Sequence, residues 1–449
     1  MAIDDRTLAA DLGSVCANWR ELDPSRDANL AIDGLLPPLW CQPGSPEELA
    51  AVLELANRCG AAVIPRGGGT RMSLGCPPRA ADLLLSTRGL TRLVEYEPAD
   101  LTVTVEAGLG LSELQERLGA DGQFLALDPP TADRATIGGV VASNASGPLR
   151  LRYGSARDLV IGTRVANADG LLTKAGGRVV KNVAGYDLNK LYTGSLGTLG
   201  VIVELSFKLH PLPQSRATVL ATFDDLDAAA AVVARVMRSP LGPAALEVVT
   251  SAGEEALPSS LPVTGRGCAL AVLVAGFEKA VARVTQEIGD LCRERGQVEV
   301  RADDQDARGL WALLRDVADG SDPGRPVLKL AVPPAHSVEA LARLRSVLER
   351  PRLPAMLVAH AGVGLVYARL EQRDWSDPEL ERLAAAVSEA RSFAVEREGS
   401  LVVESCPPGL KDRVDVWGEI GPALKLMRSL KEKLDPRGTL NPGRYVGGI

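Results

Sequence analysis

The stretch from Gly176 to His210 reads GGRVVKNVAGYDLNKLYTGSLGTLGVIVELSFKLH. Glycines recur in it among Val, Leu and Ile, and glycine between apolar residues marks places where the backbone turns sharply or approaches a ligand closely. Apolar and polar side chains then alternate from Val201 to Leu209, and Pro211 ends this run, which predicts a half-buried strand. We therefore expect a glycine turn that leads into a sheet, either as the wall of a cofactor site or as a close-packed corner.

The composition of the 449 residues excludes several classes of protein. The chain is 46% hydrophobic with a formal net charge of −7, and its Lys and Arg residues are scattered, which argues against binding to nucleic acid or a membrane surface. No apolar run reaches the length of about eighteen residues that a spanning helix needs, so we predict no transmembrane segment and a cytoplasmic location. Seven cysteines, never spaced CxxC, predict reduced thiols rather than disulfides or an iron–sulfur site.

A helix over 46–59 is the clearest local prediction. Ser45 at the N-cap, Pro46 at the first helical position and Glu48 at the third form a capping box. An apolar stripe follows, and Gly60 stands where a helix of this length would end.

A short buried strand at 61–65 follows this helix and leads into RGGGTR at 66–71. Three consecutive glycines expose a row of backbone N–H groups that can surround an anion, and an arginine stands at each end of the loop. A diphosphate would suit such a loop, although a flexible glycine turn is the alternative.

A second candidate loop reads LDPPTADRATIGGVVASNASG at 127–147. The prolines at 129–130 can continue neither a helix nor a central strand, so an extended loop is expected. Thr136 is predicted to cap a helix, and Gly138 and Gly139 would permit close backbone contact with a flat ligand.

Five blocks, in this order, resemble the vanillyl-alcohol oxidase and p-cresol methylhydroxylase (PCMH) superfamily of FAD-binding proteins. They are PRGGGTR at 65–71, TIGGVVASNASG at 136–147, YGSARDLVIG at 153–162, KNVAGYDLNKLYTGSLGTLGVI at 181–202 and LDPRGTLNPGRY at 434–445. The resemblance implies an α+β fold with a PCMH-type two-subdomain FAD-binding domain and an α+β cap domain.

The expected domain organisation has four parts. They are an N-terminal segment (1–30), the FAD-binding domain (31–214), the substrate-side cap (215–405) and a C-terminal segment (406–449) that returns to the FAD-binding domain. For the cap we predict an antiparallel sheet with helices on one face. Its predicted strands are 217–223, 244–249, 268–276, 327–332 and 355–360, and its predicted helices lie near 225–238, 278–295, 336–349 and 378–397.

The resemblance also implies where FAD would bind, with its diphosphate against the first two loops and its ring near 153–158 and 194–202. The implied contacts are Pro65, Arg66, Gly67, Gly68, Gly69, Thr70, Arg71, Pro129, Thr136, Ile137, Gly138, Gly139, Ser143, Asn144, Gly147, Tyr153, Gly154, Arg157, Asp158, Gly197, Gly200, Val201, Ile202 and Asn441. Relatives with a histidyl flavin carry His where this sequence has Thr70, so we expect non-covalent FAD.

Two departures from the family pattern concern the cap and the flavin loop. The 2-hydroxy-acid dehydrogenases of this group have a metal motif HxGDGNxH, followed later by Glu-His. Here the corresponding residues are HAGVGLVY from His360 to Tyr367, and then Glu404-Ser405. Too few ligands remain for a metal, and His360 is interpreted as a packed or hydrogen-bonded residue. Leu196 replaces the Glu of the flavin-loop motif GSEGTLG.

With these departures, the chain is similar to the smaller FAD-binding subunit of bacterial glycolate oxidase, the E-type subunit. That subunit accompanies a related FAD-containing D-type subunit and an iron–sulfur F-type subunit. The resemblance implies a part in the oxidation of glycolate to glyoxylate, with electrons passed to the iron–sulfur subunit, in the cytoplasm or at the inner membrane through the complex. Lys181, Tyr186 and His360 are the candidate catalytic residues.

Two alternatives remain open from the sequence. One is an autonomous FAD-dependent D-2-hydroxy-acid dehydrogenase of the D-lactate type. The other is a flavin-bearing assembly or electron-relay subunit without substrate chemistry.

Overall fold

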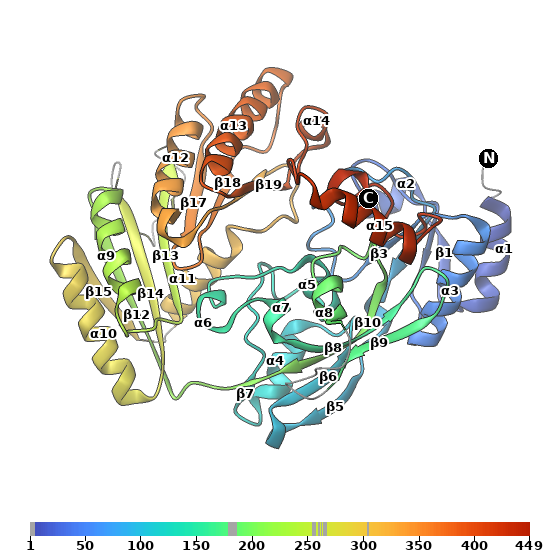
Figure 1. Cartoon of the computed structure of the whole chain (residues 1–449), viewed down its shortest axis with the longest axis horizontal. Helices are drawn as coiled ribbons and strands as arrows, with labels where there is room; N and C mark the ends of the chain where they lie inside the picture. Colours follow the sequence, from blue (N-terminus) through green and yellow to red (C-terminus); the bar gives the residue numbers. More distant parts are fainter. Residues whose placement is uncertain are drawn as a thin grey trace.

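The computed structural model describes residues 5–177, 186–253, 257–258, 261, 263, 267–302 and 305–449. In this part of the chain, smaller sheets built by the amino-terminal half stand beside one large sheet built by the carboxy-terminal half (Figure 1). The last residues, red in Figure 1, return to the amino-terminal half. This mixture of helices and separate sheets agrees with the predicted α+β class.

The first sheet is small and mainly parallel, and the loop 66–71 follows its edge strand. Helices α1 and α3 pack together and share a hydrophobic cluster with this sheet. In order across the sheet the strands are β1 (Trp19–Glu21), β2 (Leu39–Cys41), β4 (Leu83–Ser86) and β3 (Val63–Arg66), and the helices nearby are α1 (Asp5–Val15), α2 (Pro24–Asp27) and α3 (Pro46–Cys59).

Helix α3 has the predicted bounds. Ser45 Oγ accepts a hydrogen bond from Glu48 N at 3.1 Å, and Gly60 ends the helix in the left-handed region at φ +71°. The Glu48 carboxylate does not complete the box on Ser45, because it accepts from Gly44 N at 2.8 Å instead. The local signals were sufficient to place this helix.

The second sheet is antiparallel and carries the predicted strand after the glycine turn. Its core is closed by short helices from the loops that the family resemblance singles out. The strands in order are β5 (Leu93–Glu97), β6 (Thr102–Glu106), β10 (Val201–Lys208), β8 (Val160–Ala166) and β9 (Leu172–Gly176). The helices are α4 (Leu111–Gly119), α5 (Ile137–Ser143), α6 (Arg150–Tyr153), α7 (Ala156–Leu159) and α8 (Leu188–Tyr192), and a separate pair of strands is formed by β7 (Gln123–Phe124) and β11 (His210–Pro211).

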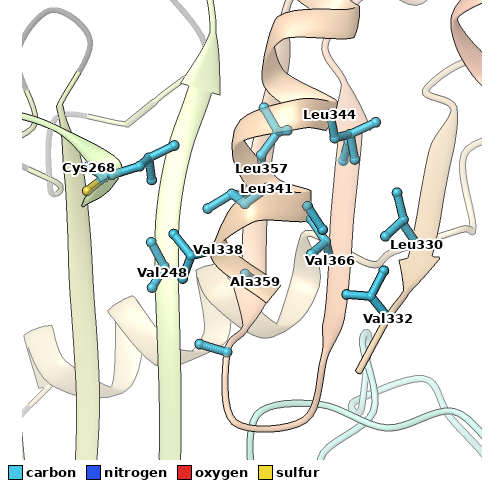
Figure 2. Packing of buried hydrophobic residues seen from close by; sticks show 14 of the residues in the cluster. Val248, Cys268, Leu330, Val332, Val338, Leu341, Leu344, Leu357, Ala359 and Val366 are labelled. Atoms are coloured by element: carbon cyan, nitrogen blue, oxygen red, sulfur yellow. The ribbon is translucent and has the colours of Figure 1, made fainter. Parts of the chain in front are cut away.

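The large sheet is the cap, and all its strand pairs are antiparallel. In order, its strands are β15 (Gln297–Ala302), β12 (Ser215–Phe223), β14 (Cys268–Gly276), β13 (Ala245–Ala252), β17 (Ala355–His360), β18 (Leu365–Leu370), β16 (Val327–Ala331) and β19 (Ser400–Ser405). Four helices share one hydrophobic core with a single face of this sheet: α9 (Leu226–Arg238), α10 (Glu278–Arg293), α12 (Ser337–Glu349) and α13 (Asp377–Glu396). Figure 2 shows Val338, Leu341 and Leu344 of α12 above the apolar side chains of these strands.

The cap contains elements that the sequence analysis did not predict. Helix α11 (Gln305–Asp316) packs against the opposite face of the sheet, so the helices are not all on one face. Strand β15 is an edge strand with mostly exposed, partly charged side chains, which hid its pattern. Strands β18 and β19 contain residues that the sequence analysis compared only with the metal motif of related dehydrogenases and did not predict as strands.

The C-terminal segment, with helices α14 (Pro408–Lys411) and α15 (Ala423–Leu434), ends against strand β3. Val63 N donates to Thr439 O at 2.7 Å, and Asn441 N donates to Val63 O at 2.8 Å. The buried ammonium of Lys431 donates to Thr198 O at 2.7 Å and to Leu440 O at 2.8 Å. The segment after α15 is thereby fixed between β3 and the flavin-loop residues 195–200.

Candidate functional site: a groove in the amino-terminal half and a charged cluster at the cap

A groove opens where the glycine loops, helix α5, the turn before β10 and the C-terminal segment meet. It encloses about 720 Å³ of empty space, counted to its open mouth. Its walls are formed by Pro65, Arg66, Gly67, Gly68, Gly69, Thr70, Arg71, Met72, Leu74, Thr87, Gly138, Gly139, Ala142, Ser143, Leu196, Gly197, Val201, Ile202, Asn441 and Arg444. Segments that are far apart in the sequence thus build one site.

The glycine loop needs its glycines because other backbone lies against it. A Cβ on Gly68 would lie 2.1 Å from Arg134 O, and a Cβ on Gly67 would lie 2.2 Å from Thr136 Oγ1. Thr136 occupies the predicted N-cap position of α5, but its hydroxyl accepts from Gly68 N at 3.1 Å and not from the helix. Thr136 therefore ties the two loops together instead of capping α5.

Arg66 brings a positive charge to this end of the groove. Burial, and the nearby charge of Arg88, lower the pKa of Arg66. In the part of the chain that the structure describes, no carboxylate pairs with its guanidinium. An unpaired cation beside the backbone N–H groups of a glycine loop fits the diphosphate of FAD.

Among the described residues, the groove wall also contains buried polar atoms without partners. Asn441 Nδ2 donates to Leu196 O at 2.7 Å, while Asn441 Oδ1 is buried and forms no hydrogen bond. A guanidinium nitrogen of Arg444 donates to Leu74 O at 2.6 Å and also to Met72 O, but Arg444 Nε is left without an acceptor. Burial lowers the pKa of Arg444 to about 10. Such orphaned atoms are rare in folded proteins and indicate a missing polar partner.

A charged cluster lies where the groove meets the cap. Glu404, which is only 6% exposed, contacts Arg71 at 2.6 Å and Lys329 at 3.0 Å. Burial alone would raise the pKa of Glu404, but the charges of Lys329 and Arg71 outweigh it and lower the pKa to about 2. Because Arg71 also lines the groove, this cluster connects the groove to the cap.

Strand register explains why these cap residues meet. Lys329 of β16 lies directly opposite Tyr367 of β18, and Glu247 of β13 lies opposite His360 of β17. The pairing of β16 with β19 is irregular, because Val327 faces Ser405 and the next residue faces Val403, so Glu404 falls in the irregularity. A bulge of this kind re-aims a side chain, which is common at functional sites.

The cluster continues into the cap through aromatic and acidic groups. Lys329 Nζ lies 5.9 Å from the centre of the Tyr367 ring, whose centre is 5.2 Å from that of His360. His360 Nδ1 lies 2.5 Å from Glu247 Oε2, and both side chains are buried. Burial raises the pKa of Glu247, although the contact with His360 opposes this shift.

These residues do not fit a divalent metal. Both oxygens of Glu404 face cations, and His360 Nδ1 is occupied by Glu247. Within the described ranges, no group of three or more His, Cys, Asp or Glu side chains is placed to hold a metal ion. Donors of that kind and number are what zinc, iron or manganese require.

The structure brings together many, but not all, of the predicted site residues. Those that do not line the groove are Pro129, Thr136, Ile137, Asn144, Gly147, Tyr153, Gly154, Arg157, Asp158 and Gly200. Several of these residues support the loops; Gly147 N, for example, donates to Asp128 Oδ1 at 3.2 Å. Tyr153 packs edge-on against His210, and Arg157 is exposed.

The candidate catalytic residues do not form one site. His360 is buried in the cap, the Tyr186 side chain is 95% exposed, and Lys181 lies outside the described residues. Groove residues that the sequence analysis missed are Met72, Leu74, Thr87, Ala142 and Arg444, while Leu196 was noted there only as a departure from the family motif. Arg444 lies three residues after Asn441 in the motif at 434–445. The sequence did not reveal that its side chain is buried at the groove.

Comparisons with known proteins identify the family. A model of an FAD binding domain matches residues 37–176, and a model of the C-terminal domain of FAD linked oxidases matches residues 212–445. The chain belongs to the FAD-linked oxidases. The predicted membership of the PCMH-type superfamily and the assignment as an FAD-dependent oxidoreductase are thereby confirmed.

Relatives match this FAD-linked oxidase over most of its length. Glycolate oxidase subunit GlcD of Bacillus subtilis is 28% identical over 91% of this chain and 89% of its own length. A D-lactate dehydrogenase of Archaeoglobus fulgidus is 30% identical over 90% of each chain. The crystal structure of p-cresol methylhydroxylase with bound substrate matches with a TM-score of 0.75 at 17% identity, covering 98% of this chain and 96% of its own.

One further property can be read from the helices of this oxidase. In the described ranges, no helix has both the length and the apolar content to cross a bilayer.

Gly68→Ala should weaken FAD binding at least tenfold, because its Cβ would displace the backbone at Arg134. The measurement is flavin absorbance retained after gel filtration, with circular dichroism to verify folding. Gly119→Ala is the matched control, since its Cβ would meet nothing within 4 Å. Full flavin content in the Gly68 variant would show that the loop does not contact the cofactor.

Glu404→Gln should lower the free energy of unfolding at pH 7 by about 3 kcal/mol, because two cations lose their buried partner. The pKa of Glu404 is about 2 in the folded protein against 4.5 as the ordinary value, so the unfolded state binds more protons between these pH values. The wild-type advantage should thus be complete above pH 4.5 and disappear as the pH falls toward 2.

Urea unfolding at several pH values measures this effect. Glu287→Gln, at an exposed ion pair with Arg283, is the control and should change little. An equal loss in the two variants at pH 7 would contradict a special role for Glu404.

Proposed function

We propose that this chain takes part in the oxidation of a small 2-hydroxy acid, as the FAD-binding subunit of a glycolate oxidase-type complex. Electrons would pass from this subunit to an iron–sulfur subunit. The names of the relatives support the substrate class, since they include a glycolate oxidase subunit and D-lactate dehydrogenases. The cluster of Arg71, Lys329 and Glu404 beside the groove is the observation that carries the proposal.

The charge balance of this cluster suits a substrate carboxylate. Two cations face one carboxylate, so the cluster keeps one excess positive charge at a partly buried position. An excess of buried positive charge is unfavourable, and a monocarboxylate would balance it. The same cluster joins the groove to the cap, which would hold the acid between the flavin and the cap sheet.

Bound FAD would supply the acceptor for the hydride from C2 of the acid. Of the three candidate catalytic residues, His360 has the best surroundings for taking the hydroxyl proton. Nδ1 faces the Glu247 carboxyl group; in the tautomer in which Nδ1 is the donor to Glu247, Nε2 is the nitrogen that can accept a proton. Loss of the hydride and this proton would convert the 2-hydroxy acid into the 2-oxo acid, glyoxylate in the case of glycolate.

The relay alternative also has support. Leu196 places an apolar side chain in the groove where related dehydrogenases carry a carboxylate, and it holds a left-handed backbone at φ +53°. Glu404 already occupies both cations of the cluster, so a substrate would have to compete with an internal carboxylate. An autonomous dehydrogenase of the D-lactate type is the third possibility.

The proposed FAD is non-covalent, because Thr70 and the other residues that line the groove include no His, Cys or Tyr. These are the side chains whose ring nitrogen, thiol or phenol can attach to a flavin. We expect heat or mild acid to release all the flavin from the polypeptide. Flavin fluorescence that stays with the chain on a denaturing gel would contradict this expectation.

Anaerobic stopped-flow mixing separates the three functions. We expect glycolate or D-lactate to bleach the flavin of the isolated chain at least about a hundredfold more slowly than that of the complex with its D-type and F-type partners, because groups that stabilise charge are missing. In the complex, His360→Gln should slow bleaching, and a chelator should have no effect on the site formed by this chain.

The other outcomes assign the other functions. Rapid bleaching of the isolated chain, insensitive to chelator, would make it an autonomous dehydrogenase. A complex whose rate is unchanged by both His360→Gln and Lys329→Met would leave this chain with a relay or assembly role.

A further inference from the structure

Within the described residues, two buried groups in the groove wall lack partners, and they differ in kind. Asn441 Oδ1 is an acceptor without a donor, and Arg444 Nε is a donor without an acceptor. Both residues line the groove. They belong to one short turn, in which Arg444 N donates to Asn441 O at 3.4 Å. An unsatisfied donor and an unsatisfied acceptor therefore come from one turn of the groove wall.

The directions of both side chains are fixed by the protein. Leu196 O can only accept, so the Asn441 amide must present Nδ2 to it and turn Oδ1 away. The guanidinium of Arg444 is held by the carbonyls of Met72 and Leu74. Neither side chain can satisfy its remaining atom by rotating without breaking these contacts.

Arg444 is also a buried cation that forms no direct ion pair with a described residue; the carboxylate whose charge acts on it, Asp33, is paired with Lys411. Its side chain is almost fully buried, and within the described residues its hydrogen-bond acceptors are neutral carbonyls. A charge in such a position is costly unless a ligand compensates it. The missing partner is thus expected to carry negative charge, permanently or after a reaction.

The lining of the groove offers two kinds of surface. Arg66 and the N–H groups of the glycine loop suit a diphosphate. The carbonyls that hold Arg444 and Asn441 belong to Met72, Leu74 and Leu196, three apolar residues that also line the groove and suit a flat ring. The pyrimidine ring of a flavin has an N3–H donor flanked by two carbonyl acceptors, which is the complement of the two orphaned atoms.

We infer that Asn441 and Arg444 recognise the pyrimidine edge of the flavin. Asn441 Oδ1 would accept from flavin N3–H, and Arg444 Nε would donate to the neighbouring carbonyl. The guanidinium would also stabilise the negative charge that this ring carries when N5 receives an electron pair. This inference rests on FAD binding, which the family establishes, and not on the oxidation of any acid.

Sulfite titration of the FAD-loaded protein tests the role of Arg444 without a hydroxy acid. Sulfite donates its electron pair to flavin N5, and the adduct carries negative charge on the pyrimidine ring. Arg444→Met should raise the dissociation constant for sulfite at least tenfold, because a nearby positive charge is lost. Arg391→Met is the matched control, since Arg391 is a partly buried arginine of α13 that also donates to backbone carbonyls.

Binding of 3-methyl-FAD tests Asn441 independently, even if the Arg444 variant does not fold. Methylation replaces N3–H and would leave Asn441 Oδ1 without its donor. The wild type should bind FAD at least tenfold more tightly than 3-methyl-FAD, and Asn441→Ala should reduce this preference to about twofold or less.

Two results would overturn the inference. One is equal binding of FAD and 3-methyl-FAD by the wild type. The other is an Arg444→Met variant that binds FAD weakly but keeps the wild-type affinity for sulfite, which would assign Arg444 to the diphosphate. If substrate oxidation fails while both expected results are obtained, the proposed function is wrong and the flavin assignment still holds.

Discussion

The carboxylate of Glu404 is the group on which the junction of the two halves depends. Arg71 follows β3 in the amino-terminal half, and Lys329 belongs to the cap sheet, so one buried anion binds cations from both. Two further contacts cross the same junction, from Thr131 N to Asp316 Oδ1 at 3.0 Å and from Arg134 to Ser321 Oγ at 2.9 Å. Burial excludes water and strengthens the ion pairs, which fixes the groove against the cap sheet.

The groove combines two kinds of recognition. At the glycine loop, backbone N–H groups and Arg66 present positive charge. A side chain at Gly67 or Gly68 would collide with neighbouring atoms, so only glycine fits at these positions. Asn441 and Arg444 add unsatisfied atoms whose directions are fixed by contacts with backbone carbonyls. A ligand with a charged linker and a flat polar-edged ring matches both features, which agrees with membership of an FAD-linked family.

Local signals in the sequence were sufficient for many elements but not for their contacts. Helix α3 could be predicted because its cap, stripe and C-terminal glycine are neighbours in the sequence. Thr136 was placed correctly at a helix start, but its hydroxyl bonds to Gly68, a partner 68 positions away. Helix α11 was missed although Leu310 and Leu314 repeat on one face.

The candidate site illustrates the same limit. The family resemblance indicated the glycine loops, and these do line the groove. The pairing of Arg71 with Glu404 spans 333 positions, and it depends on the bulge that turns Glu404 out of the strand register. The alternation of apolar and polar residues in a sequence does not reveal such a bulge. The ion pairs of Glu404 with Arg71 and Lys329 therefore became visible only in the structure.

The return of the C-terminal segment has a consequence for biogenesis. The contact from Asn441 to Leu196 spans 245 positions and that from Arg444 to Met72 spans 372, so the groove is complete only after residues 441–444 have left the ribosome. Closing such long loops is slow and entropically unfavourable. Because a ligand stabilises the closed form by mass action, the supply of flavin would determine how much newly made chain keeps its tail docked. Flavin-starved cells would therefore accumulate chains whose undocked tail is open to proteases.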